Sequence, residues 1–155
     1  MLLLRVDEII QVYGGGDLGL MGAVASAVSE NGGHVTGVIP QSLYNVVNKA
    51  VGTTVIVDTM HERKMKIYEM SSAFLALPGG LGTLDELFEV LTWQQLGIHN
   101  RPVAVLNVEG FFDPIIDMIS KAKEKGLFFF LAVDSSKKHH GHDFPKILLF
   151  GEDSS

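Results

Sequence analysis

The sequence contains no cysteine among its 155 residues, which excludes disulfide bonds and thiolate chemistry. It also lacks an excess of basic residues: 12 lysines and arginines face 18 aspartates and glutamates, giving a formal net charge of −6. Contacts to phosphate backbones need a basic surface, so this balance argues against a nucleic-acid-binding protein.

No hydrophobic run is long enough to span a membrane, and the longest, residues 127–133, has the length of a strand. The apolar start, residues 1–4, is too short for a signal peptide, so we expect an intracellular protein of the cytoplasm or nucleus.

The order of apolar runs and helical patterns indicates an α/β protein. With 46% apolar residues, a chain of this length can bury one full hydrophobic core. Short apolar runs alternate with segments of helical spacing, which is typical of parallel strands covered on both faces. We therefore predict a Rossmann-like three-layer fold with a mostly parallel sheet. The expected strands cover residues 9–13, 35–39, 55–57, 74–77 and 103–108, and the expected helices cover residues 20–28, 60–72, 83–96 and 113–125.

These patterns predict one domain followed by a tail. Residues 1–133 contain no internal repeat and no linker, so we expect them to form a single Rossmann-like domain. Residues 134–155 have no clear period and are expected to form an irregular tail, whereas residues 41–54 fit either a short helix or a loop. The tail histidines His139, His140 and His142 could hold a metal ion weakly. A polar tail explains them better, and we predict no metal site.

Residues 78–86, Pro-Gly-Gly-Leu-Gly-Thr-Leu-Asp-Glu, form the most informative motif of the chain. They lie between an expected strand and an expected helix. Glycines let the backbone approach a ligand closely, and the N–H groups and dipole of a helix start favour negative charge. Glu86 adds a carboxylate beside this anion site. The motif indicates an enzyme that acts on a phosphorylated small molecule.

The same motif also has a purely structural interpretation. Thr83-Leu84-Asp85-Glu86 matches a capping box, with Thr83 as the N-cap and Glu86 at the third helical position. Such a cap stabilises a helix by about 0.5–2 kcal/mol and needs no catalytic role. Spacing alone favours the capping box for Glu86, although the two roles are not strictly exclusive.

A second glycine-rich segment, residues 14–22, follows the first expected strand. Gly14, Gly16 and Gly19 match the spacing of the dinucleotide-binding fingerprint. That fingerprint also needs an acidic residue at the end of the next strand, and residues 35–41 contain none. Two interpretations therefore stay open: a phosphate or nucleotide loop of another kind, and glycines that merely allow a tight turn.

Residues 60–64, Met-His-Glu-Arg-Lys, begin a helix directly after a strand. Their side chains can therefore face the C-terminal edge of the sheet, where open α/β folds bind ligands. Arg63 could clamp a phosphate or carboxylate through two hydrogen bonds. The simpler interpretation is a solvent-exposed charged helix start, and His61 alone is typical of a surface histidine. Phe88 and Trp93 are expected in the core or in an oligomer interface.

Together these motifs resemble the LONELY GUY family of cytokinin riboside 5′-monophosphate phosphoribohydrolases, older members of which were labelled lysine decarboxylases. The resemblance lies in residues 14–22, 60–64 and 78–86, and further similarity lies in residues 92–99 and 102–110. It spans about residues 10–127 in register, and three separated motifs in the right order make it specific. No lysine is placed for a Schiff base with a pyridoxal cofactor, so the decarboxylase label gains no support.

The resemblance implies a reaction, a set of residues and an assembly. It implies hydrolysis of the N-glycosidic bond of an N6-substituted AMP, giving a free cytokinin base and ribose 5-phosphate, by a homodimer without metal or organic cofactor. Arg63 and Glu86 would be the catalytic pair. The carboxylate of Glu86 would stabilise the positive charge that builds on the ribose, or activate the attacking water. The implied substrate-binding residues are Gly79, Gly80, Gly82 and Thr83 of a phosphate loop, together with Lys64, Gly15, Gly16 and Met21.

The sequence departs from that family at both ends. The family's first strand, expected at the centre of the sheet, has no counterpart before residue 10, and the segment after Gly126 does not match its last strand and helix. Residues 41–59 are also shorter than usual and lack an acidic loop. We therefore expect a truncated product that keeps the catalytic pair, with weak or absent activity. The alternatives are a non-catalytic nucleotide or cofactor binder, as in molybdenum cofactor carriers, and a subunit that pairs with complete relatives through the Trp93 region.

Overall fold

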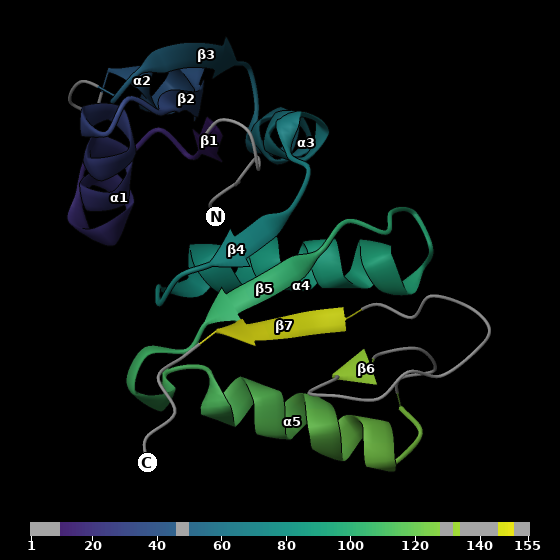
Figure 1. The fold of residues 1–155 in the computed structure, drawn as a ribbon. Helices are drawn as coiled ribbons and strands as arrows, with labels where there is room; N and C mark the ends of the chain where they lie inside the picture. Colours follow the sequence, from purple (N-terminus) through teal and green to yellow (C-terminus); the bar gives the residue numbers. More distant parts are fainter. Residues whose placement is uncertain (1–9, 46–49, 128–131, 134–145, 151–155) are drawn as a thin grey trace. The chain divides into compact units, whose positions relative to one another are not determined.

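The computed structural model describes residues 10–45, 50–127, 132–133 and 146–150, which belong to two compact units (Figure 1). The N-terminal unit comprises residues 1–73 and the C-terminal unit residues 74–155. Parallel strands alternate with helices along the described chain, which confirms the predicted α/β class. The predicted boundary at residue 133 between a domain and a tail stays a prediction.

The N-terminal unit contains a parallel sheet in the order β1-β2-β3. Its strands are β1 (Ile10–Tyr13), β2 (His34–Pro40) and β3 (Thr53–Val57). Tyr13 is paired with Gly37, and Pro40 with Val57. The carboxyl ends of all three strands therefore lie at the same edge of this sheet.

The connections of this unit are helical. The helix α1 (Gly19–Glu30) joins β1 to β2, and the short helix α2 (Gln41–Tyr44) follows β2 where the sequence allowed either a helix or a loop. The helix α3 (Met60–Met70) follows β3, as expected.

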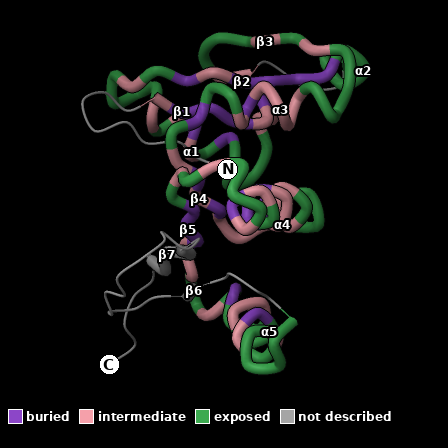
Figure 2. The backbone as a smooth tube through the Cα atoms, turned by 90° about the vertical axis from the view of Figure 1, so that its right-hand side faces the viewer, coloured by how far each residue is buried: buried purple, intermediate pink, exposed green. Residues whose placement is uncertain are grey.

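The two long helices of the N-terminal unit cover opposite faces of its sheet. In β1, Val12 packs in a cluster with Ile67 of α3, whereas Tyr13 packs in a cluster with Ala25 of α1. Adjacent residues of a strand point to opposite faces, so the layers are α1, sheet and α3. Within this unit, β1 and β2 contain most of the buried residues (Figure 2). The predicted strands β1 and β2 are largely buried because both faces are covered, whereas the edge strand β3 is exposed or half-buried along its length.

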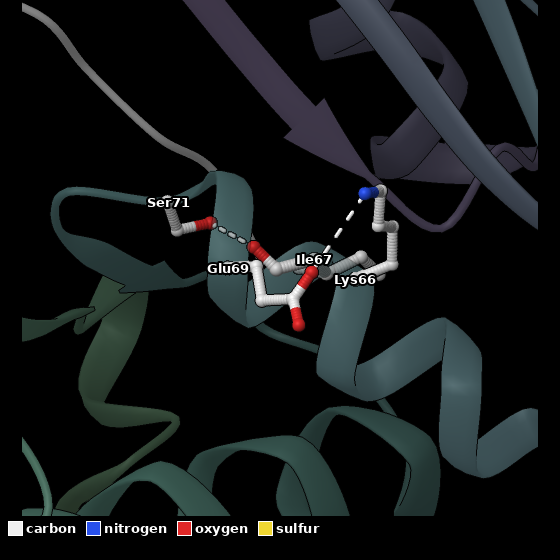
Figure 3. Close-up of polar contacts among 4 residues, drawn as sticks. All are labelled: Lys66, Ile67, Glu69 and Ser71. Carbon is white, nitrogen blue, oxygen red and sulfur yellow. Dashed lines mark hydrogen bonds and ion pairs between the residues drawn. The ribbon is translucent and has the colours of Figure 1, made fainter.

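The C-terminal end of α3 is fixed by a local hydrogen bond (Figure 3). The buried Ser71 hydroxyl donates to the carbonyl oxygen of Ile67 at 2.6 Å. One turn of the same helix also carries an exposed ion pair between Lys66 and Glu69, with nitrogen and oxygen 3.7 Å apart. An exposed pair of this kind contributes little to stability, so the Ser71 bond and the buried Ile67 hold this end of the helix.

The C-terminal unit contains a second parallel sheet in the order β4-β5-β7-β6. Its strands are β4 (Phe74–Ala76), β5 (Val103–Leu106), β6 (Ala132–Val133) and β7 (Lys146–Phe150). The strand β7 pairs with β5 from Val103–Ile147 to Leu106–Phe150, although the sequence analysis expected no strand in that segment. Its apolar run, residues 147–150, was the available sequence signal, but it follows a long stretch without a period and its partner strand is far away along the chain.

Two helices of the C-terminal unit match the expected segments. The helix α4 (Leu81–Gln95) buries a stripe at helical spacing, and Gly97 with φ +71° follows its end. The helix α5 (Asp113–Glu124) follows a short 3-10 turn, η1 (Val108–Gly110). The buried stripe of α4 consists of Leu87, Val90, Leu91 and Gln94.

Candidate functional site

The N-terminal unit brings the first glycine-rich segment and Arg63 together. Gly14, Gly15 and Gly16 leave β1 at the carboxyl edge of the sheet, and α3 begins at the same edge after β3. The Arg63 side chain is half-buried, and its Nε–H donates to the carbonyl oxygen of Val38 in β2 at 3.2 Å. Its guanidinium lies against the α-carbon of Gly14, where an added Cβ would overlap Nη2 and stand 2.9 Å from Cζ. Lys64, the next residue, is also half-buried.

The start of α3 is held by a capping box that the sequence analysis did not identify. The N-cap Thr59 accepts a hydrogen bond on Oγ1 from the Glu62 N–H at 3.1 Å, and Glu62 Oε2 accepts from the Asp58 N–H at 3.0 Å. Arg63 then donates its backbone N–H to the Thr59 carbonyl at 3.0 Å. The charged segment 60–64 is therefore not only a solvated helix start, since its first turn fixes the backbone from which Arg63 extends.

The glycines after Gly14 are required by close packing. Gly15 is buried with φ +77°, and an added Cβ would overlap Cγ1 of Ile39. Gly37 in β2 approaches so closely that its own Cβ would lie 2.8 Å from the Gly15 α-carbon. At Gly16 an added Cβ would overlap Cε of Met21, so the Met21 side chain covers that glycine. The structure thus places the predicted residues Gly15 and Gly16 in the loop after β1, with Met21 of the following helix α1 against Gly16.

The C-terminal unit places the second glycine-rich motif between β4 and α4, and it corrects the predicted capping box. The helix begins at Leu81 with Gly80 as its N-cap, and no side chain caps it. Thr83 is therefore the third helical residue rather than the N-cap, and its N–H donates to the Gly80 carbonyl at 3.0 Å. The predicted capping box of Thr83 and Glu86 is wrong, because the N-cap is Gly80, three residues before Thr83.

The Thr83 side chain folds back over the loop that precedes its helix. A Cβ added at Gly79 would overlap the Thr83 hydroxyl oxygen and lie 3.0 Å from its Cβ. Glu86 follows three residues later, is half-buried, and shares a helix face with Thr83. Gly79 and Thr83 therefore lie against each other at the start of α4, with Glu86 about one turn further along the helix.

Arg63 and Glu86 belong to different units, so their predicted pairing stays a prediction. Phe88 and Trp93 are both half-buried, which fits their expected place in the core or an interface. Within the described residues no group of three or more histidine, cysteine or carboxylate side chains could hold a metal ion. The tail histidines lie outside the described residues. None of the helices in the described segments has the length and hydrophobicity that a membrane span requires.

A polar turn that the sequence analysis did not single out follows β5. The Asn107 amide donates to Asp113 Oδ1 at 2.7 Å, and its oxygen accepts from the Phe112 N–H at 2.8 Å. Within this turn Glu109 adopts φ +50°, a conformation that costs free energy outside glycine. An asparagine directly after an apolar run, with an aspartate before a helical proline, was the available sequence signal.

The half-buried His99 links α4 to the segment before β5. His99 Nε2 lies 2.9 Å from the Val90 carbonyl, and Nδ1 accepts from the Arg101 N–H at 3.1 Å. The two backbone partners fix a neutral ring with its proton on Nε2. Burial is the main cause that lowers the pKa of His99; the Val90 hydrogen bond raises it and the Arg101 charge lowers it. His99 thus serves the packing of the unit rather than acting as a surface histidine.

Comparisons with known proteins agree with the sequence motifs. A family model described as "Possible lysine decarboxylase" matches residues 21–136. The chain is 52% identical over 128 residues to the cytokinin riboside 5′-monophosphate phosphoribohydrolase LOG of Oryza sativa subsp. japonica, covering 81% of this chain and 52% of that relative. It is 50% identical over 117 residues to LOG2 of Arabidopsis thaliana, a protein of the same description, covering 74% of this chain and 55% of the relative. With LOG4 of Arabidopsis thaliana it shares 51% identity over 127 residues, or 81% of this chain and 58% of the relative. The chain spans about half the length of the curated relatives it matches.

Proposed function

Since this chain belongs to the LOG family of phosphoribohydrolases, we propose that it hydrolyses the N-glycosidic bond of cytokinin riboside 5′-monophosphates. The observation that carries the proposal is the extent of the family match. Residues 21–136 contain both Arg63 and the complete 78–86 motif, and the relatives are about 50% identical across most of this chain.

The start of α4 would bind the substrate phosphate. A helix of 15 residues carries a positive dipole end, and its first N–H groups have no partners within the helix. Gly80 lacks a side chain that could cap them, so an anion can approach the backbone directly. The Thr83 hydroxyl, held over Gly79, supplies a further donor at the same end.

Arg63 would bind the phosphate or ribose and orient the reacting bond. Its Nε–H is used by the Val38 carbonyl, so contacts to a ligand would come from the two terminal nitrogens. Two such nitrogens in one plane can hold a phosphate or a pair of hydroxyls bidentately. Lys64, Gly15, Gly16 and Met21 are proposed as further substrate contacts.

Glu86 would act on the reacting carbon. In the reaction, water adds its oxygen to C1′ of the ribose while the bond from C1′ to the purine nitrogen breaks, and the base leaves with a proton that comes from water. Positive charge builds on the ribose before the new bond forms. A fixed carboxylate stabilises that charge or accepts the proton of the attacking water, and each role contributes about 10²–10⁴-fold to the rate.

Product analysis with purified chain tests the proposal. Incubation with N6-isopentenyl-AMP should release the free base and ribose 5-phosphate in equal amounts, measured by liquid chromatography. The matched riboside, which lacks the phosphate, should be hydrolysed far more slowly because the phosphate anchors the substrate. Equal rates for both substrates would contradict the role of the α4 loop. Titration calorimetry with the same nucleotide identifies a protein that binds without turnover, which would contradict the hydrolase.

Two properties that the family resemblance implies remain proposals for this chain. We propose that it forms a homodimer and that it works without a metal or organic cofactor. Full activity after exhaustive treatment with a chelator would support the second proposal, and recovery of activity only on adding a divalent cation would contradict it.

A further inference from the structure

The Arg63 guanidinium lies so close to Gly14 that a side chain at position 14 would displace it. An added Cβ would overlap the Arg63 guanidinium at Nη2 and stand 2.9 Å from Cζ and 3.5 Å from Nε. The backbone of Gly14 does not lie in the left-handed region, so its φ alone would permit an ordinary residue. Space for the guanidinium in its present place, rather than backbone conformation, therefore favours glycine at this position.

The backbone of Gly14 is held in place by its two neighbours in the chain. Tyr13, the preceding residue, is buried, and its hydroxyl oxygen accepts from the Val51 N–H at 3.0 Å. Gly15, the following residue, is buried with φ +77° and packs against Ile39. The loop is held on both sides of Gly14 and cannot step back to make room for a larger residue.

The Arg63 side is fixed as well. The capping box at Thr59 and Glu62 holds the first turn of α3, and Ile67 buries the next turn in a cluster with Val12. The helix cannot retreat without losing both. Nε donates to the Val38 carbonyl at 3.2 Å, and the guanidinium also lies against Gly14.

We propose that Gly14, with the Val38 carbonyl, forms a socket that sets the direction of the Arg63 guanidinium, so that Gly14 is a positioning residue for Arg63. Its consequence for turnover rests on the proposed function, but the socket itself does not. The guanidinium is the end of a flexible side chain, so a methyl group at position 14 displaces it at modest cost to the fold. Misplacement by about 1 Å at a reacting site lowers rates by about 10²-fold.

The test compares Gly14→Ala with a matched control, Gly32→Ala. Gly32 has φ +81° and nothing within 4 Å of an added Cβ, so alanine there strains the backbone without meeting any side chain. We expect Gly14→Ala to lower kcat by about 10²-fold with a small change in Tm. We expect Gly32→Ala to lower Tm by about 2–8 °C and to leave kcat unchanged.

A spectroscopic readout tests the socket without any turnover. The chain has three arginines, Arg5, Arg63 and Arg101, so the Nε–H signals in a nitrogen–proton correlation spectrum are few, and loss of one signal in Arg63→Lys assigns Arg63. In the parent chain the Arg63 signal should be protected from solvent exchange, because Nε–H is bonded to Val38. Gly14→Ala should abolish that protection, and Gly32→Ala should preserve it.

The outcomes separate the two claims. An Arg63 Nε–H signal that stays protected in Gly14→Ala overturns the socket, whatever the activity. A displaced signal with unchanged kcat overturns the positioning role. A parent chain without turnover contradicts the proposed function, and the exchange measurement then still decides the socket. If Gly14→Ala does not fold, the double variant Gly14→Ala/Arg63→Met must recover folded protein, since it lacks the guanidinium; failure to recover it overturns the proposal.

Discussion

Replacing Thr59 by alanine is expected to destabilise the protein, whereas the same change at Thr83 is not. Both threonines precede a glutamate by three residues, so the sequence contains two matches to the capping box, at Thr59–Glu62 and Thr83–Glu86. Only Thr59 is an N-cap, with its hydroxyl 3.1 Å from the Glu62 nitrogen. Loss of such a cap costs about 0.5–2 kcal/mol.

The magnitude and the assay follow from that geometry. For a domain of this size, about 1 kcal/mol corresponds to a fall of about 2–4 °C in Tm, so Thr59→Ala should lower Tm by about 1–8 °C in calorimetry. Thr83 is the third residue of α4 and its hydroxyl caps no helix end, so Thr83→Ala should change Tm by less than about 1 °C.

Two further variants and one outcome complete this test. Glu62→Ala should resemble Thr59→Ala, since Glu62 Oε2 accepts the Asp58 N–H at 3.0 Å. Thr83→Ala should instead weaken nucleotide binding in calorimetry, because its hydroxyl lies over the proposed phosphate loop. A larger loss of Tm in Thr83→Ala than in Thr59→Ala would refute the reasoning and restore the capping box at α4.

Three other predictions concern His99, the Gly79 loop and assembly. Burial lowers the pKa of His99, so the unfolded chain binds a proton at this residue more readily than the folded chain. The free energy of unfolding should therefore fall as the pH drops from about 6.5 through the lower folded pKa. In urea titrations His99→Gln should make the free energy of unfolding less dependent on pH, and an unchanged dependence would contradict this account. Gly79→Ala should push the Thr83 hydroxyl aside and raise KM for the nucleotide at least about tenfold, whereas an unchanged KM would exclude that hydroxyl from binding. Sedimentation of purified chain should give a dimer, and a monomer at micromolar concentration would contradict the proposed homodimer.

Most of the elements could be predicted from the sequence because their signals are local. The strands β2 and β5 are short apolar runs, and the buried stripe of α4 recurs at helical spacing, so both kinds of element can be identified within a few residues. The strand β7 has an apolar run as well, residues 147–150, but it follows a long polar stretch and its partner β5 is far away along the chain. The ends of elements were harder to predict where glycines are present, because glycine fits both a loop and a helix start. At α4, Gly80 and Gly82 allowed the helix to begin before Thr83.

The candidate site was predictable in its residue types but not in its contacts. The motifs identified Arg63, Glu86 and both glycine-rich loops, yet nothing local connects Gly14 with Arg63. Their contact depends on the pairing of β1, β2 and β3, which brings the ends of separate strands to one edge. The hydrogen bond from Arg63 to the Val38 carbonyl could not be predicted either, because any residue supplies a backbone oxygen.

The most direct test of the account is base release by Glu86→Gln compared with the parent chain. The substitution keeps the size of the side chain and removes its charge, and Glu86 does not cap α4. We predict that the parent releases free base from N6-isopentenyl-AMP, and that Glu86→Gln loses at least about 10²-fold of that rate with a Tm within about 1 °C of the parent. Undiminished release by Glu86→Gln, or a loss of activity that merely follows a lowered Tm, would contradict the catalytic role of this glutamate.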